Sequence, residues 1–367
     1  MGYRLLKFRL KISKVIVITI IWQVAGVLYA WYMHSFIEAV TSMDNVFNLQ
    51  RSILYTFLSA SFAGLTVGAT EVFLLKRLFR RKSFIFTVVW KSLLYFVLLL
   101  IMFYLVLMIY AANVRPESYA GDSLVVATYR VFVSTPILYD LIYWVGVMVI
   151  TFIFLQFSEK FGPGGLSGYI FGKYHRPHKQ TRIFMFLDIR DSTSIAERLG
   201  HVKYFSFLND FFSDIADSVL FTKGEIYQYV GDEVVVSWKL DDGLKNANFV
   251  RCLFAIKDRI RKKQDIYKNH YGEAPNFKAG FFHGEVTAGE IGAVKKEVVF
   301  SGDVLNTGSR IQEKCNYYNV DNLISKGLLK FVNLPTGVSY KRVDSLLLKG
   351  KVKDIELYTL FRFQENG

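Results

Sequence analysis

Long apolar segments in the first 157 residues constrain this chain more than any other feature of its sequence. A helix rises about 1.5 Å per residue, so about 20 apolar residues cross the hydrocarbon core of a bilayer. Each segment reaches that length, and the first is too long for a signal-peptide core and lacks a small-residue cleavage site. The four predicted membrane spans are Val15–His34, Ile53–Leu75, Phe84–Ala112 and Ile137–Phe157.

The distribution of basic residues predicts the orientation of these spans. Lys and Arg gather in Arg4–Lys14 and in Lys76–Lys82, whereas the loops Glu38–Arg51 and Asn113–Thr135 are poor in them. Cytoplasmic loops carry the excess of basic residues. We therefore expect a multi-pass protein of the inner (plasma) membrane, embedded in bilayer lipid, with its N-terminus and its C-terminal half in the cytoplasm.

Two features inside the spans have structural consequences. Glu71 and Lys91 flank one cytoplasmic loop at similar depth, and a charge in hydrocarbon is costly unless it is paired, so we expect them to pair. Ala60, Gly64 and Gly68 follow one another at four-residue spacing, which permits close helix approach. That contact is either between two chains or within one chain's own bundle.

The formal charge of +14 does not predict a nucleic-acid partner, because much of it flanks the apolar spans. No nucleic acid is therefore expected among the partners. The two cysteines, Cys252 and Cys315, have no metal-type spacing and make no disulfide framework.

The change in composition along the chain predicts three parts. Residues 1–157 form a four-helix transmembrane domain, residues 158–180 a membrane-proximal linker and residues 181–362 a soluble domain with mixed charges. Within the linker, Gly162–Gly165 includes a proline and Pro177 follows, so a helix that leaves the last span is expected to break here.

The soluble part follows the order strand, helix, hairpin. Arg182–Leu187 is a short apolar run typical of a strand, and Tyr204–Leu220 is an amphipathic helix. Glu225–Val230 and Glu233–Trp238 are strands joined by a Gly-Asp turn. This order predicts an α+β, ferredoxin-like core in which the first strand lies beside the hairpin.

In such a core, two carboxylates are expected at one edge of the sheet. Asp188 ends the first strand and Asp232 sits in the hairpin turn, and paired hard oxygen ligands favour Mg²⁺. Ser192 or Thr193 is expected to cap the next helix, whose first N–H groups suit a phosphate.

Four motifs resemble those of the class III adenylate and guanylate cyclases. The resemblance covers about residues 182–360, and the linker and the multi-span anchor are similar to bacterial membrane-bound members. The motifs are FLDIRDST at Phe186–Thr193, YQYVGDEVVVSW at Tyr227–Trp238, VVFSGDVLNTGSRIQ at Val298–Gln312 and LLLKGKVKDIELY at Leu346–Tyr358.

The resemblance implies a cofactor. Asp188 and Asp232 match the family's metal aspartates and would hold two Mg²⁺ ions per site, with the Ile189 carbonyl as a further ligand. Mn²⁺ is the alternative metal. The two ions promote in-line attack of the ribose 3′-OH on the α-phosphate.

The resemblance also assigns groups to the substrate. Asn306 matches the residue that orients the ribose, Arg310 the residue that stabilises the α-phosphoryl group, and Lys351 the residue on the β- and γ-phosphates. Ser192 and Thr193 belong to the phosphate loop.

Base selection departs from the family pattern. Gln228 stands where adenylate cyclases have Lys, and Val299 where they have Asp or Thr; guanylate cyclases have Glu and Cys there. A Gln amide both donates and accepts, so it suits adenine and, after a flip, guanine. Adenine is our choice, because adenylate cyclases dominate among the bacterial relatives.

The expected function is therefore a membrane-bound adenylate cyclase that converts ATP to 3′,5′-cyclic AMP and pyrophosphate for intracellular signalling. The alternatives are a guanylate or other nucleotide cyclase, and a membrane sensor that binds nucleotide without turnover. VGDEV at Val230–Val234 is also similar to the diguanylate cyclase signature, but SGDVLNTGSR downstream belongs to class III.

The family architecture implies a homodimer with shared sites. The metal aspartates come from one chain, and the Asn, Arg and Lys come from its partner. This chain has one cyclase domain that carries both sets, so two head-to-tail copies would complete two sites.

The predicted topology is testable with reporter fusions. Because both ends are expected in the cytoplasm, fusions after Asp44 and Asp122 should report the non-cytoplasmic side. Fusions after Lys82 and Gly367 should report the cytoplasm. A cytoplasmic signal at Asp122 would contradict the assignment.

Overall fold

The computed structural model describes residues 2–41, 49–75, 86–87, 89–98, 100–101, 135–161, 172, 174–346 and 354–363. It divides into two compact units, Met1–Gly162 and Pro163–Gly367. Each is described by itself.

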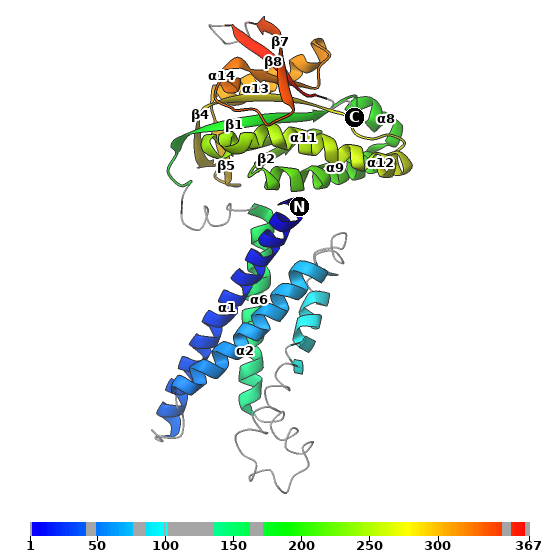
Figure 1. The fold of residues 1–367 in the computed structure, drawn as a ribbon. Coiled ribbons are helices and arrows are strands. Elements are labelled where there is room, and N and C mark those ends of the chain that lie inside the picture. The colour runs from blue at the N-terminus through cyan, green and yellow to red at the C-terminus, as the bar shows by residue number, and fades with distance from the viewer. Residues whose placement is uncertain are drawn as a thin grey trace. The chain divides into compact units, whose positions relative to one another are not determined.

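The first unit is helical. Its labelled helices are α1 (Gly2–Thr41), α2 (Leu49–Ala69), which continues as the π-helix η1 (Thr70–Leu75), and α6 (Thr135–Phe161) (Figure 1). Lys11–Phe36 and Ser52–Leu75 are long and apolar enough to cross a membrane, and they contain the first two predicted spans. Shorter apolar helices run over Val89–Leu98 and Ile142–Leu155, the latter inside the fourth predicted span. Most of the third, Phe84–Ala112, lies outside the described residues.

The helices of this unit expose large apolar side chains. A helix that is apolar all round is typical of a protein core or a membrane span. More than half of each side chain's reference surface is open in the following residues: Leu28, Trp31, Tyr32, Leu54, Tyr55, Phe62, Leu74, Tyr139, Ile142 and Ile150.

The small residues of the second predicted span pack against the first helix of the same chain. A Cβ on Gly64 would lie 2.7 Å from the Thr19 Cα, and one on Gly68 would lie 3.1 Å from a Val15 methyl group. Ala60 faces Gly26 in the same way. Of the two alternatives, the structure therefore supports packing within one bundle.

The predicted pair of Glu71 and Lys91 is confirmed. The Lys91 Nζ donates to a Glu71 carboxylate oxygen over 2.5 Å, and Tyr95 donates to the other oxygen. Only 5% of the Lys91 side chain and 12% of the Glu71 side chain are exposed. The pair supplies the charge compensation that such apolar surroundings require.

The second unit contains a sheet of eight strands in its described part. The strand order is β2-β3-β1-β4-β6-β8-β7, with β5 paired to β4, and β4 and β6 are parallel. The strands are β1 (His178–Ile189), β2 (Glu225–Val230), β3 (Glu233–Lys239), β4 (Phe277–Ile291), β5 (Glu297–Ser301), β6 (Asn322–Ser325), β7 (Val338–Leu346) and β8 (Ile355–Arg362).

Helices cover both faces of this sheet. Figure 1 shows α9 and α11 on one side of β1 and α13 on the other. The helices are α8 (Ser192–Leu199), α9 (His201–Phe221), α10 (Leu240–Leu244), the short 3₁₀-helix η2 (Lys245–Ala247), α11 (Asn248–Lys262), α12 (Gln264–Tyr271), α13 (Asp303–Tyr317) and α14 (Lys326–Leu329).

The predicted strand–helix–hairpin order is confirmed, with β1 beside the hairpin strand β3. One boundary differs. β1 begins at His178, inside the predicted linker, because it pairs with β4 along its whole length. α6 is described as far as Phe161, and the break predicted at Gly162–Gly165 lies outside the described residues.

α13 lies very close to the sheet because two glycines leave room for it. A Cβ on Gly280 of β4 would lie 2.5 Å from the backbone nitrogen of Gln312. A Cβ on Gly308 of α13 would meet the ring of Phe186. The backbones of helix and sheet therefore approach more closely than any larger residue allows.

Gly280→Ala should destabilise the second unit by about 1–3 kcal/mol, because the methyl group meets backbone and α13 must shift. Calorimetry of the purified chain in detergent should show the unfolding midpoint of this unit lowered by several degrees. Gly327→Ala is the matched control, since its Cβ would meet nothing closer than His283 at 3.6 Å. Equal midpoints for the two variants would contradict the close approach.

Candidate active site

Strand alternation places Asp188 on the α13 side of the sheet. Ile183, Met185 and Leu187 belong to the core beneath α9 and α11, whereas Phe184 and Phe186 pack on the other face. Side chains alternate along a strand, so Asp188 shares the face of Phe184 and Phe186.

Asp232 reaches the same place through the hairpin turn. Gly231 has a φ of 61°, the left-handed conformation that a tight two-residue turn requires. The turn brings Asp232 next to Asp188, as predicted, because the register pairs Asp188 with Glu233 across β1 and β3.

The site holds excess negative charge. Burial raises the pKa of Asp188, and the Asp232 carboxylate beside it raises that pKa further, whereas Lys278 opposes the shift. Burial also raises the pKa of Glu233 to about 7, with a contribution from both aspartates. The one cation that the described residues pair with Asp188 is Lys278, with 3.2 Å between Nζ and Oδ2.

Sequence reasoning missed three neighbours of this pair. Lys278 faces Asp188 directly across β1 and β4, and the Gln312 side-chain amide donates to Asp188 over 3.1 Å. Tyr204 on α9 lies near both aspartates and Ser192; burial is the main cause of its raised pKa. The β1–β4 register would have revealed Lys278, but Gln312 and Tyr204 depend on helix rotation.

Asn306 and Arg310 lie on the outward face of α13. The inward face carries Gln312 together with buried Val304 and Ile311. At 100° per residue, Arg310 is rotated about 160° from Gln312, and Asn306 is only about 40° from Arg310. The two predicted substrate groups therefore point away from the sheet that carries Asp188.

The prediction that Ser192 or Thr193 caps the following helix is wrong. Asp191 takes the N-cap position with a φ of 54°, and its carbonyl accepts from Ile195 N over 3.0 Å. The helix begins at Ser192 because Asp tolerates this left-handed conformation. Ser192 and Thr193 thus lie in the first turn, where backbone N–H groups are unsatisfied.

The two base-site candidates come from β2 and β5, which do not pair with each other in the sheet. Gln228 is exposed next to a β-bulge in β2, and Val299 is half-buried in β5. One side-chain hydrogen bond links β2 to β5: the Tyr227 hydroxyl accepts from the backbone N–H of Phe300 over 3.1 Å. Lys351, which was assigned to the β- and γ-phosphates, lies outside the described residues. The Ile189 side chain is buried, and the predicted metal ligand of this residue is its backbone carbonyl.

Residues 174–362 match the family described as "Adenylate and Guanylate cyclase catalytic domain". The match covers slightly more than half of the chain. The chain belongs to this family. The resemblance of the four motifs is thereby confirmed for the catalytic part.

Two relatives and one solved structure show the range of similarity to this cyclase. "Adenylate cyclase 2" of Rhizobium meliloti (strain 1021) is 32% identical over 235 residues, which are 63% of this chain and 61% of the relative. "Adenylate cyclase" of Anabaena cylindrica is 26% identical over 43% of this chain and 32% of the relative. The chain thus spans about three fifths of the first relative and about a third of the second.

The solved structure is a bacterial light-regulated adenylyl cyclase. It is 18% identical, has a TM-score of 0.49, and the match covers 59% of this chain and 63% of that chain.

The residues of the cyclase site fit divalent cations. Two adjacent carboxylates, one with a pKa raised by the other, form an anionic pair of hard oxygen donors. The described residues contain no group of three or more His, Cys, Asp or Glu side chains suited to a metal. A metal here would therefore need the Ile189 carbonyl and substrate oxygens to complete its ligands, which suits Mg²⁺ in nucleotide sites.

Proposed function

We propose that this cyclase is a membrane-anchored adenylate cyclase that converts ATP to 3′,5′-cyclic AMP and pyrophosphate. The observation that carries the proposal is the convergence of Asp188 and Asp232 on the catalytic fold of the family. The names of the relatives from Rhizobium meliloti and Anabaena cylindrica agree with it.

The chemistry follows from the groups present. Asp188 and Asp232 would hold two Mg²⁺ ions, or Mn²⁺ in their place, with the carbonyl of Ile189. When bound, the metal would lower the pKa of the ribose 3′-OH and neutralise the triphosphate. Gln312 and Lys278 hold the Asp188 carboxylate in place.

The substrate groups have complementary roles. Asn306 orients the ribose, and Arg310 offers a fixed positive charge to the α-phosphoryl group as charge develops there. Lys351 neutralises the β- and γ-phosphates. The first-turn N–H groups at Ser192 and Thr193 take phosphate oxygens at a helix N-terminus.

ATP is the proposed substrate, with GTP as the second candidate. The exposed Gln228 amide presents both a donor and an acceptor to the edge of a base, and Val299 adds an apolar contact. The same amide suits guanine when flipped, which is the specific reason to retain GTP.

We further propose a homodimer with two shared sites. Asn306 and Arg310 face away from their own Asp188, so a second copy is needed to bring them to a metal pair. Exposed apolar residues lie beside both the metal-binding and the substrate-binding residues. Tyr229 and Val230 are near Asp232, and Tyr317, which is 77% exposed, lies on the same side of α13 as Arg310. Such exposed apolar surface is typical of protein–protein contacts.

The first unit is proposed as a four-span anchor in the inner (plasma) membrane, with the N-terminus and the cyclase domain cytoplasmic. The two long apolar helices and the apolar exterior of the unit support membrane association. The finer assignment of four crossings and their orientation rests on the sequence pattern.

Turnover tests the function. The purified chain, given Mg²⁺ or Mn²⁺ with ATP or GTP, should form cyclic AMP faster than cyclic GMP, as measured by mass spectrometry of the products. Asp188→Asn and Asp232→Asn should each lower turnover by at least about 100-fold, because each removes a metal ligand.

Asp191→Asn is the matched control. It removes an exposed carboxylate from the same motif, and Asn tolerates the left-handed conformation, so activity should stay near wild type. Cyclic GMP as the main product would favour the second candidate. No cyclic nucleotide from any nucleoside triphosphate would refute the proposal.

Complementation tests the shared sites. Asp188→Asn and Arg310→Ala chains should each be nearly inactive alone. If equal amounts pair at random, half of the dimers are mixed, and each mixed dimer has one intact site, so co-expression should restore about a quarter of wild-type activity. Mixed dimers verified by two affinity tags that stay as inactive as either parent would contradict the model.

A further inference from the structure

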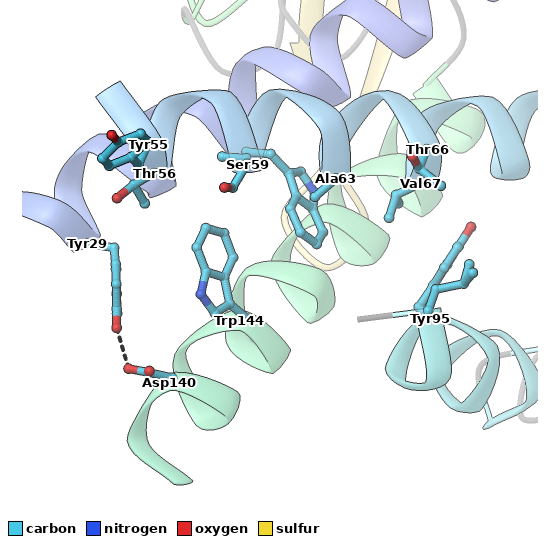
Figure 2. A pocket seen from close by; sticks show the side chains of 13 residues that line it. Tyr29, Tyr55, Thr56, Ser59, Ala63, Thr66, Val67, Tyr95, Asp140 and Trp144 are labelled. Atoms are coloured by element: carbon cyan, nitrogen blue, oxygen red, sulfur yellow. Dashed lines mark hydrogen bonds between the residues drawn. The ribbon is translucent and has the colours of Figure 1, made fainter. Parts of the chain in front are cut away.

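The first unit contains a cavity that the cyclase reaction does not use. Its volume is about 230 Å³, and α1, α2, α6 and the segment Val89–Leu98 contribute its walls. This volume lies just below the ~300–1,000 Å³ of sites for drug-sized ligands, so a small molecule would fill it. Figure 2 shows Asp140 and Tyr29 at one end, Tyr95 at the other, and Trp144 between them.

Aromatic rings form much of the wall. Trp22 and Trp144 stack with ring centroids 5.7 Å apart and planes 20° apart, and Tyr29 lies 5.8 Å from Trp144. Tyr55 faces the same space from α2 (Figure 2). Aromatic faces carry partial negative charge and attract organic cations.

The carboxylate of Asp140 has no cationic partner in the part of the chain that the structure describes. The hydroxyl of Tyr29 donates a hydrogen bond to it. Glu71, the acid of α2 and η1, is instead neutralised by Lys91. Glu71 and Asp140 thus both lie in apolar surroundings, where an uncompensated charge is costly. Among the described residues, only Glu71 has a cationic partner.

A second polar group in the wall is also unpartnered. Trp22 is 3% exposed, and its indole Nε1 has no hydrogen-bond acceptor among the described residues. Buried N–H groups in folded proteins almost always have a partner. That nitrogen is itself buried, so the cavity offers the Asp140 carboxylate as its anionic acceptor, beside the aromatic surface of Trp22 and Trp144.

We propose that this cavity binds a small amphiphilic amine. The ammonium group pairs with Asp140, and the apolar body lies against the rings of Trp144 and Trp22. In the predicted topology Tyr29, Tyr55 and Asp140 all lie near the span ends farthest from the cytoplasm, so the ligand enters from outside the cytoplasm.

Binding is tested on the full chain in lipid nanodiscs, without nucleotide, so its result is independent of turnover. The probes are 2-(4-methoxyphenyl)ethylammonium and the alcohol and carboxylate of the same skeleton. The ammonium should bind at least about tenfold more tightly than the alcohol, and the carboxylate should show no saturable binding, because only the cation compensates Asp140.

Two variants and their controls locate the site. Asp140→Asn should weaken ammonium binding at least about tenfold and leave alcohol binding within about twofold, while Asp140→Glu should keep the preference for the cation. Trp144→Phe should reduce the ligand-dependent change in tryptophan fluorescence, since only Trp22 would then report from the cavity wall, whereas Trp31→Phe, at a side chain 61% exposed, should retain it in full.

Three outcomes would overturn the proposal. Equal binding of ammonium and alcohol would mean an apolar pocket for any chain, such as a lipid acyl chain. An Asp140→Asn variant that keeps the cation preference would exclude that carboxylate. If none of the three probes binds to the wild-type chain, the cavity is not a ligand site of this kind.

Discussion

β1 is hydrogen-bonded to β3 on one side and to β4 on the other, and the geometry of the catalytic unit depends on these two ladders. A slip of one residue in either would turn Asp188 to the opposite face, among the buried side chains beneath α9. The register also selects the neighbours of the carboxylate, with Glu233 on one side and Lys278 on the other. The ladders therefore position the acid and determine the charges around it.

α13 has two roles, and its two faces divide them. The inward side packs on the sheet through Gly308 and positions Asp188 through Gln312. In the proposed dimer, the outward side would present Asn306 and Arg310 to the second copy. Because the helix lies against the backbone of β4 at Gly280, it cannot roll without losing this contact. The same close packing thus stabilises one half-site and orients the other.

Features of the site that depend on local sequence pattern could be predicted from the sequence. Strand alternation and the Gly-Asp turn led to Asp188 and Asp232, and the family motif covers the same residues. The sequence was insufficient where tertiary packing decides. Gln312 and Tyr204 reach the site only through the rotation of α13 and α9, and the register of a distant strand brings Lys278 to Asp188. The cap was assigned to Ser192 or Thr193 because hydroxyl caps are common, whereas the backbone of Asp191 starts the helix.

The ion pair between Glu71 and Lys91 links two segments of the proposed membrane anchor. Either residue alone would carry an uncompensated charge into apolar surroundings, whereas together they are neutral. During synthesis the earlier segment emerges first with its acid exposed, and it gains its counter-charge only when the next segment follows. In the proposed anchor, release into lipid would therefore favour the two segments entering together as a hairpin rather than one helix at a time.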